Sequence, residues 1–185
     1  MINIIFGLTA LLNQCTVKTP GLNYITHKYL INVIEIYGCE KSKSLKTITI
    51  DYETNLGGMA NDNNIMINGY LDEIMIEPVL VHEMAHLVNM DLSIDLKKEF
   101  RNISWNKFER PQKDFVSGYA MKNAGEDFAE TATFFVYHNF DFRVLSLKSE
   151  KLKLKYEFMK KLFGKTFKQK VKSYKGLQIF YSTEV

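Results

Sequence analysis

The segment His82-Glu83-Met84-Ala85-His86 carries two imidazoles four residues apart, with a carboxylate between them. Residues four apart lie on one face of a helix, so His82 and His86 can reach a single zinc ion. Glu83 is rotated by about 100° from His82 on such a helix, so it can reach a water molecule at the metal without being a ligand. This spacing predicts a zinc-dependent hydrolytic site in which Glu83 is the general base.

The residues around this segment are almost all apolar. They are Val79, Leu80, Val81, Met84, Ala85, Leu87 and Val88. A helix that is apolar all round is a buried one. Burying two imidazoles and a carboxylate is costly unless these groups are hydrogen-bonded or bind a metal. A metal site fits this setting, and the alternative is a buried helix whose polar side chains make ordinary hydrogen bonds.

A catalytic zinc site needs a third protein ligand and one open position. The candidates are His27, His138, Glu126, Asp127 and Glu130. Glu126 and Glu130 are four residues apart and share a helix face, whereas Asp127 points elsewhere. Asn123 and Glu126 also have the spacing of a capping box, which stabilises a helix by about 1 kcal/mol. The spacing alone does not decide whether Glu126 is a metal ligand or part of a helix cap. His27 and His138 are expected to be packing or surface residues.

Two motifs together resemble those of a known group of enzymes. The second motif reads Phe115-Val116-Ser117-x-Tyr119-Ala120-x-x-Asn123-x-x-Glu126-Asp127-Phe128-Ala129-Glu130. With the histidine motif, it resembles the zinc-binding metallopeptidases found among bacterial surface lipoproteins. More distantly, it is similar to the catalytic domains of anthrax lethal factor and the Pro-Pro endopeptidases. All are gluzincins, in which a Glu on a later helix completes the metal site. The resemblance covers residues 47–175, including Gly57-Gly58-x-Ala60 and a Lys-rich helical tail.

The resemblance implies an α+β, zincin-like metallopeptidase domain with a small mixed sheet, an active-site helix and a second helix that carries the Glu ligand. It implies that one zinc ion (Zn2+) per chain is held by His82, His86 and Glu126. Glu130 would accept a hydrogen bond from a ligand histidine, His82, and Tyr119 would be an active-site phenol that stabilises the oxyanion. Without the resemblance, the residues favour a packing role for Tyr119.

The expected function is that of a zinc-dependent endopeptidase, which hydrolyses peptide bonds through a zinc-activated water with Glu83 as general base. A peptide substrate is expected to bind extended, as an added strand along residues 65–67. Gly57 and Gly58 would allow close backbone approach, or they only form a turn. The alternative function is a non-catalytic, zinc-containing peptide- or surface-binding module. A closed structural zinc site would want a fourth ligand, usually Cys, and neither Cys15 nor Cys39 lies near the motif.

The elements that must position these residues follow from periodicity, caps and turn residues. Helices are expected at residues 22–37 (closed by Gly38), 78–89 (with Pro78 in the first turn), from Ser93, at 123–137 and at 149–163. Strands are expected at 46–53 and 65–67, separated by turn residues 57–64. Apolar residues make up 46% and charged residues 24% of the 185, which are ordinary globular values. A single metallopeptidase domain is therefore expected over residues 22–185.

The two ends of the chain raise separate questions. Residues 2–12 are apolar but too short to span a membrane, which takes about 20 residues. Residues 1–21 are interpreted as a signal or lipoprotein segment and linker, with Cys15 lipidated, which predicts an extracytoplasmic protein at the cell surface or secreted. The alternative is an ordinary N-terminal element of a cytoplasmic protein. Residues 148–185 contain eleven Lys, three Glu and no Arg, which favours the solvated face of an amphipathic helix over a nucleic-acid surface. The protein is expected to be a monomer.

Overall fold

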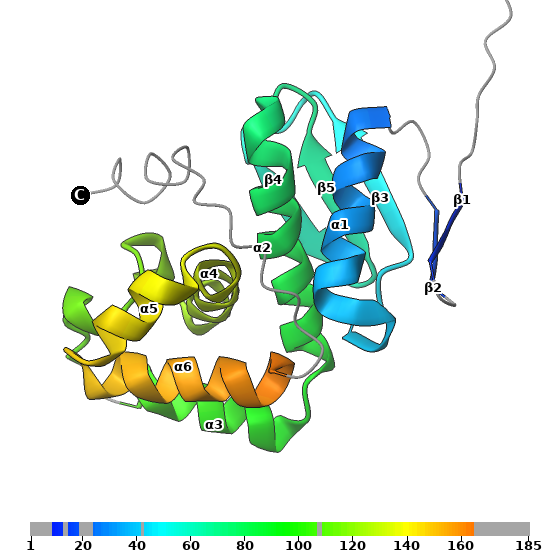
Figure 1. Ribbon diagram of the computed structural model, residues 1–185. Coiled ribbons are helices and arrows are strands. Elements are labelled where there is room, and N and C mark those ends of the chain that lie inside the picture. The colour runs from blue at the N-terminus through cyan, green and yellow to red at the C-terminus, as the bar shows by residue number, and fades with distance from the viewer. Residues whose placement is uncertain (1–8, 13–14, 19–23, 42, 107–108, 165–185) are drawn as a thin grey trace, which may run out of the picture. The chain divides into compact units, whose positions relative to one another are not determined.

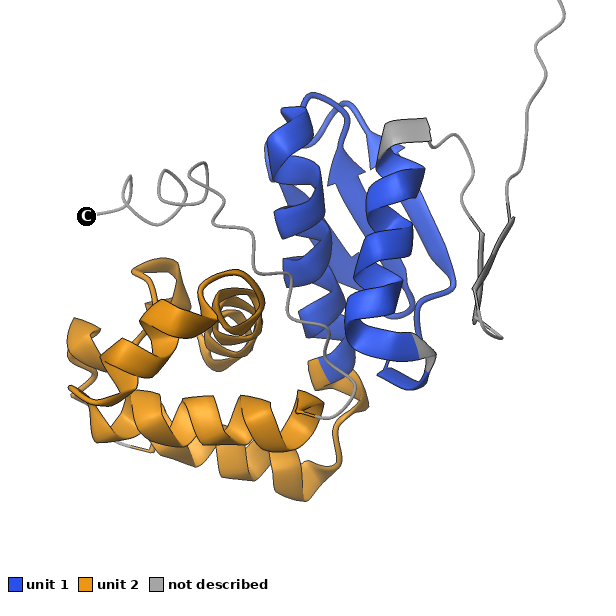
Figure 2. Ribbon diagram, viewed as in Figure 1, with its two compact units in different colours: residues 1–88 blue, residues 89–185 orange. Residues whose placement is uncertain are grey.

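The computed structural model describes residues 9–12, 15–18, 24–41, 43–106 and 109–164. The chain divides into two compact units, residues 1–88 and 89–185, which are coloured separately in Figure 2. The mixed helix and strand content confirms the α+β class. The zincin-like fold and the single domain over residues 22–185 stay predictions.

The first unit is built on a mixed sheet with strand order β1-β2-β3-β5-β4. The strands are β1 Thr9–Leu12, β2 Cys15–Lys18, β3 Thr47–Asp51, β4 Gly58–Asn61 and β5 Asn64–Asn68. β3 and β5 are parallel, and β4 and β5 form an antiparallel hairpin whose turn includes Asp62 at φ +50°. The β1–β2 hairpin joins the sheet through one residue pair, Lys18 with Thr47. The expected strands are confirmed, but Gly58 belongs to a strand and not to the turn.

One face of the sheet is covered by two helices, α1 Tyr24–Lys41 and α2 Glu73–Asp91 (Figure 1). Ile48, Ile65 and Ile67 are at most 2% exposed, and burying such a side chain contributes about 1.5–3 kcal/mol. Side chains alternate between the faces of a strand, so these three share one face. The Tyr37 hydroxyl on α1 donates a 2.8 Å hydrogen bond to the Val81 carbonyl on α2. Helix α2, which carries the histidine motif, is thus fixed to α1.

Both helices of the first unit differ from their predicted ends. Gly38 has φ +75°, which breaks the helical backbone as expected, but a further helical turn reaches Lys41. The prediction that Pro78 lies in the first turn is wrong, because α2 begins at Glu73. A proline inside a helix leaves the carbonyl four residues earlier without its donor. That residue, Ile74, is 57% exposed. Water can therefore donate a hydrogen bond to its backbone carbonyl, and the helix tolerates the proline.

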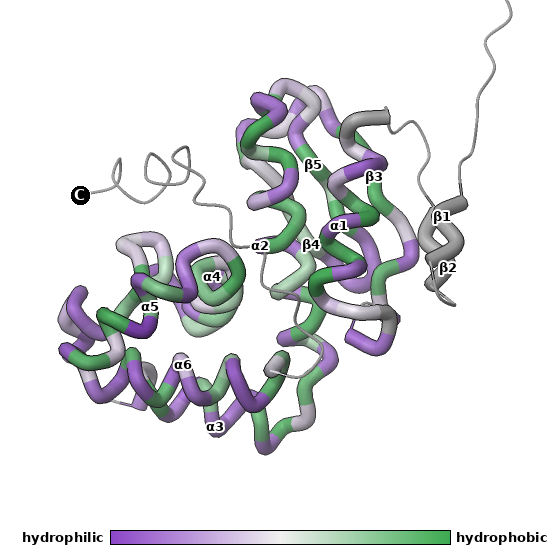
Figure 3. The backbone as a smooth tube through the Cα atoms, in the orientation of Figure 1, coloured by the Kyte–Doolittle hydropathy of each residue, from purple (hydrophilic) through white to green (hydrophobic). Residues whose placement is uncertain are grey.

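The second unit is helical. It contains α3 Ile94–Ser104, α4 Ala124–Tyr137, α5 Asn139–Ser146 and α6 Glu150–Phe163, with short 3-10 turns η1 Gln112–Asp114 and η2 Tyr119–Met121. α6 packs against α3, α4 and α5. The alternation of polar and apolar residues along α3 and α6 is visible in Figure 3. Phe100, Phe128 and Phe158 form an aromatic cluster where α3, α4 and α6 meet, with ring centroids 5.1–6.4 Å apart.

Three of these helices begin at the predicted caps. The side chains of Ser93 and Ser149 accept hydrogen bonds from backbone N–H groups three residues later, and Asn123 accepts two. Helix α5 was not predicted. None of the described helices combines the length and apolar character needed to span a membrane. Of the signal and linker segment predicted at residues 1–21, the structure describes only residues 9–12 and 15–18, which form β1 and β2. The Lys-rich tail beyond Gly164 lies outside the described residues. Lipidation of Cys15 and the predicted location stay predictions.

Candidate metal site

Helix α2 brings the two motif histidines together. The Nε2 atoms of His82 and His86 are 3.1 Å apart, and the rings meet edge to face with centroids 4.8 Å apart. Two ligand atoms on one tetrahedral zinc, each bonded at 2.0–2.1 Å, would be about 3.3 Å apart. Both side chains are half-buried, while neighbouring Leu80, Met84 and Leu87 are buried. The pair therefore has the separation that shared metal binding requires.

Glu83 lies against the edge of the sheet. Its side chain is only 6% exposed. A Cβ atom added at Gly58 of β4 would lie 2.9 Å from Glu83 Cγ, 3.0 Å from Glu83 Oε1 and 2.8 Å from Val79 Cγ1. The absence of a side chain at Gly58 is thus what allows α2 to approach β4 with the Glu83 carboxylate between them. The Gly57-Gly58 pair predicted close approach of a substrate backbone or a turn, and not the contact of Gly58 with the Glu83 side chain.

The first turn of α4 presents Glu126. Asn123 Oδ1 accepts hydrogen bonds from the Gly125 and Glu126 backbone N–H groups, at 2.9 and 3.0 Å. The helix is therefore capped by the Asn123 side chain itself. The Glu126 carboxylate accepts a 3.3 Å hydrogen bond from the Tyr119 hydroxyl and lies 3.9 Å from Lys122 Nζ. Glu126 can serve as a ligand while Asn123 retains the cap.

His82, His86 and Glu126 form a group that could hold a metal ion. No other such group occurs in the described part of the chain. Two imidazoles and a carboxylate are a donor set found in catalytic zinc sites. The other candidates do not join it. His138 stacks on Phe134 with centroids 4.9 Å apart, as expected of a packing residue.

Glu130 is buried and anchors the loop that precedes α4. It is 2% exposed and accepts a 2.6 Å hydrogen bond from Ser117 Oγ. The same Ser117 oxygen accepts a 3.0 Å hydrogen bond from the Ala120 N–H. Glu130 therefore holds the segment that carries Tyr119. Its hydrogen bond to His82 stays a prediction.

Tyr119 is positioned beside the candidate ligand Glu126. Besides its bond to Glu126, its hydroxyl accepts a 3.3 Å hydrogen bond from Lys122 Nζ, which also lies 4.8 Å from the ring centroid. Burial raises the pKa of Tyr119 above its usual value; the hydrogen bond from Lys122 opposes this, and the Glu126 charge adds to it. The phenol therefore keeps its proton at neutral pH and can donate a hydrogen bond.

The arrangement offers three potential metal ligands, a buried carboxylate adjacent to one of them and a protonated phenol adjacent to another. Sequence reasoning found each of these groups. It missed the role of Gly58 and a buried lysine on α6, described below. No protein-family model, curated protein or solved structure matches the chain.

Proposed function

We propose that the protein is a zinc-dependent endopeptidase of the gluzincin type. The observation that carries this proposal is the group formed by His82, His86 and Glu126, with Glu83 directly after the first ligand. Three ligands suit a site that keeps one position open, whereas a closed structural site takes four. This difference favours catalysis over the alternative, a non-catalytic zinc-containing binding module.

Each residue then has a defined task. His82, His86 and Glu126 would hold the zinc ion, which supplies Lewis acidity that polarises a carbonyl and acidifies water. Glu83 takes the proton of the attacking water and passes it to the leaving amine. Burial of Glu83 limits competition from bulk water. Tyr119 donates its hydroxyl proton in a hydrogen bond to the oxyanion as charge develops there.

The prediction that a peptide pairs along residues 65–67 is wrong. β5 lies between β3 and β4 and is hydrogen-bonded on both sides, so it has no edge to offer. Within the described part of the chain, β4 has a partner on one side only. We therefore propose that an extended peptide pairs along the free edge of β4. Because Gly58 of β4 touches Glu83, this edge would bring the peptide to the general base.

Metal analysis and a cleavage screen test the proposed function. Purified protein should contain about one zinc per chain, and a peptide library analysed by mass spectrometry should show internal cleavage. A chelator should abolish cleavage, and added zinc should restore it. Protein that retains no zinc under metal-replete conditions would contradict the proposal. Zinc retention without cleavage of any peptide would favour the binding module.

Gly58→Ala should impair catalysis without removing the metal. The new Cβ would overlap Val79 and Glu83, and a misplacement of about 1 Å at a reacting group can cost about 10²-fold in rate. We expect kcat to fall by about 10- to 100-fold while the zinc content stays at the parent value. Steady-state kinetics and metal analysis of the same preparation measure both.

Gly57→Ala is the matched control, because a Cβ there meets Val79 and Leu71 only at 3.6 and 3.9 Å, which are ordinary contacts. It should cleave at nearly the parent rate. Equal kcat values for the two alanine variants would show that Gly58 does not position Glu83.

A further inference from the structure

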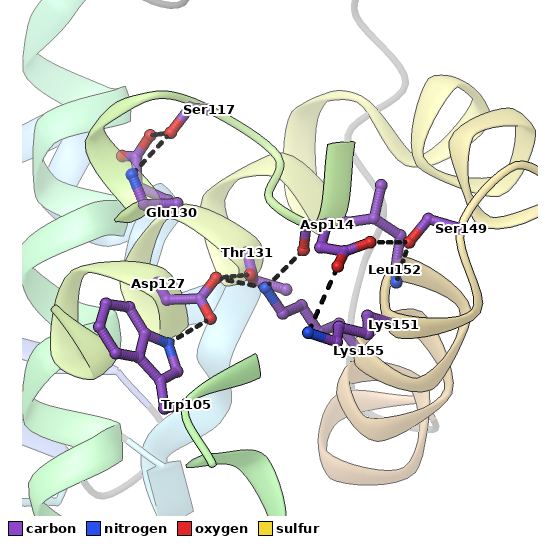
Figure 4. A network of polar contacts seen from close by, with 11 residues as sticks. Trp105, Asp114, Ser117, Asp127, Glu130, Thr131, Ser149, Lys151, Leu152 and Lys155 are labelled. Carbon is purple, nitrogen blue, oxygen red and sulfur yellow. Dashed lines mark hydrogen bonds and ion pairs between the residues drawn. The ribbon is translucent and has the colours of Figure 1, made fainter. Parts of the chain in front are cut away.

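A lysine is completely buried on the apolar face of α6. Lys155 is 0% exposed and lies three residues after Leu152 and three before Phe158, which are also buried. Its Nζ donates hydrogen bonds to Asp127 Oδ1 at 2.8 Å and to the Asp114 carbonyl at 2.9 Å (Figure 4). A buried ammonium group is costly unless it is paired. This lysine therefore has a specific structural task.

Asp127, the partner of Lys155, directly follows the candidate ligand Glu126. It is 0% exposed, and its carboxylate accepts further hydrogen bonds from Trp105 Nε1 at 2.9 Å and Thr131 Oγ1 at 3.3 Å. Donors from α4, α6 and the end of α3 thus converge on one carboxylate. Because these bonds are directional, they fix the rotation of the first turn of α4 about its axis.

The loop before α4 is held by the same network. The backbone carbonyl of Asp114 accepts a hydrogen bond from Lys155 Nζ. The side-chain carboxylate of Asp114 accepts a 2.8 Å hydrogen bond from Ser149 Oγ and forms an ion pair with Lys151 Nζ at 3.3 Å. Lys155 Nζ also lies 4.1 Å from the centroid of the Phe115 ring, a cation–π contact. Two residues after Phe115, the loop is fixed again by the Ser117–Glu130 hydrogen bond. Tyr119 lies two residues after Ser117, this second anchor.

We propose that Lys155 and Asp127 are positioning residues that hold Glu126 and Tyr119 in the arrangement needed for metal binding and catalysis. This inference rests on the proposed function. Stability alone does not require the pair, since apolar replacement of a buried ion pair is often neutral or stabilising. What an apolar pair lacks is the directional bonding that selects one rotation of α4 and one path of the loop. The buried charges serve the geometry of Glu126 and Tyr119.

The test replaces the ion pair by a neutral pair of similar size, in Lys155→Met/Asp127→Asn. Thermal unfolding should show a Tm close to that of the parent. In metal-free protein, amide hydrogen exchange of residues 114–127 should become faster, and zinc affinity measured by competition with a chromophoric chelator should fall by about 10- to 100-fold. Lys153→Met is the matched control. It removes an exposed lysine of the same helix that pairs with the exposed Glu150 and not with the network, and it should leave exchange and affinity unchanged.

A milder variant keeps the test decisive if the double variant does not fold. Trp105→Phe deletes one hydrogen bond to Asp127 and should speed exchange in residues 123–127 in the same direction, to a smaller extent. Parent-like exchange in a folded double variant, or in Trp105→Phe if the double variant is unfolded, would overturn the inference. The exchange measurement needs no metal. If the parent binds no zinc, the proposed function fails, while exchange still decides whether this network positions the turn.

Discussion

Glu83→Gln is expected to keep about one zinc per chain and to lose about 10³-fold or more in kcat. The substitution keeps the size of the side chain but removes the group that accepts the proton, and a general base contributes about 10²- to 10⁴-fold. The three proposed metal ligands are unchanged in this variant. Metal analysis and steady-state kinetics on one cleaved peptide measure the two quantities on the same sample.

A second buried glutamate on α2 provides the control. Glu77 is 2% exposed and accepts a 3.1 Å hydrogen bond from Asn32 Nδ2 on α1, so Glu77→Gln should change stability and leave kcat near the parent value. A Glu83→Gln variant that cleaves as fast as the parent would show that Glu83 is not the base.

Tyr119→Phe should lower kcat by about 10²- to 10³-fold with zinc retained, as loss of one oxyanion donor does.

Glu126→Ala should lose most of the zinc, whereas Glu130→Ala should weaken zinc binding by about 10- to 100-fold. The first removes one of the three proposed ligands. The second removes a buried acceptor that holds the Ser117 loop and is predicted to orient His82. Competition with a fluorescent chelator measures both affinities. Far-UV circular dichroism checks that each variant is folded.

Asn123→Ala separates the metal role of Glu126 from helix capping. It removes the side chain that caps α4 and should cost about 1 kcal/mol of stability. Zinc affinity should change little, because the ligand set is intact. If Glu126→Ala instead keeps full zinc occupancy and loses only a cap-sized amount of stability, Glu126 is not a ligand.

Local chemistry made the starts of α3, α4 and α6 and the histidine pair predictable from the sequence. The caps Ser93, Asn123 and Ser149 satisfy N–H groups two or three residues away. His82 and His86 are brought together by a single turn of helix, because they are four residues apart. Contacts at such short separation depend on the residues themselves and on backbone geometry.

Contacts between segments far apart in the chain were decided by the tertiary structure. β5 was expected to be an edge strand, but β4 pairs with it on the side opposite β3. β5 is therefore an inner strand of the sheet. Lys155 occupies an apolar position of α6, but its partner Asp127 lies 28 residues away, and spacing along one helix cannot identify it. The sequence thus determined which groups are available for chemistry. Strand pairing and burial depend on the whole packed chain. They decided which strand, among those that the structure describes, has a partner on one side only, and which charges hold the first turn of α4.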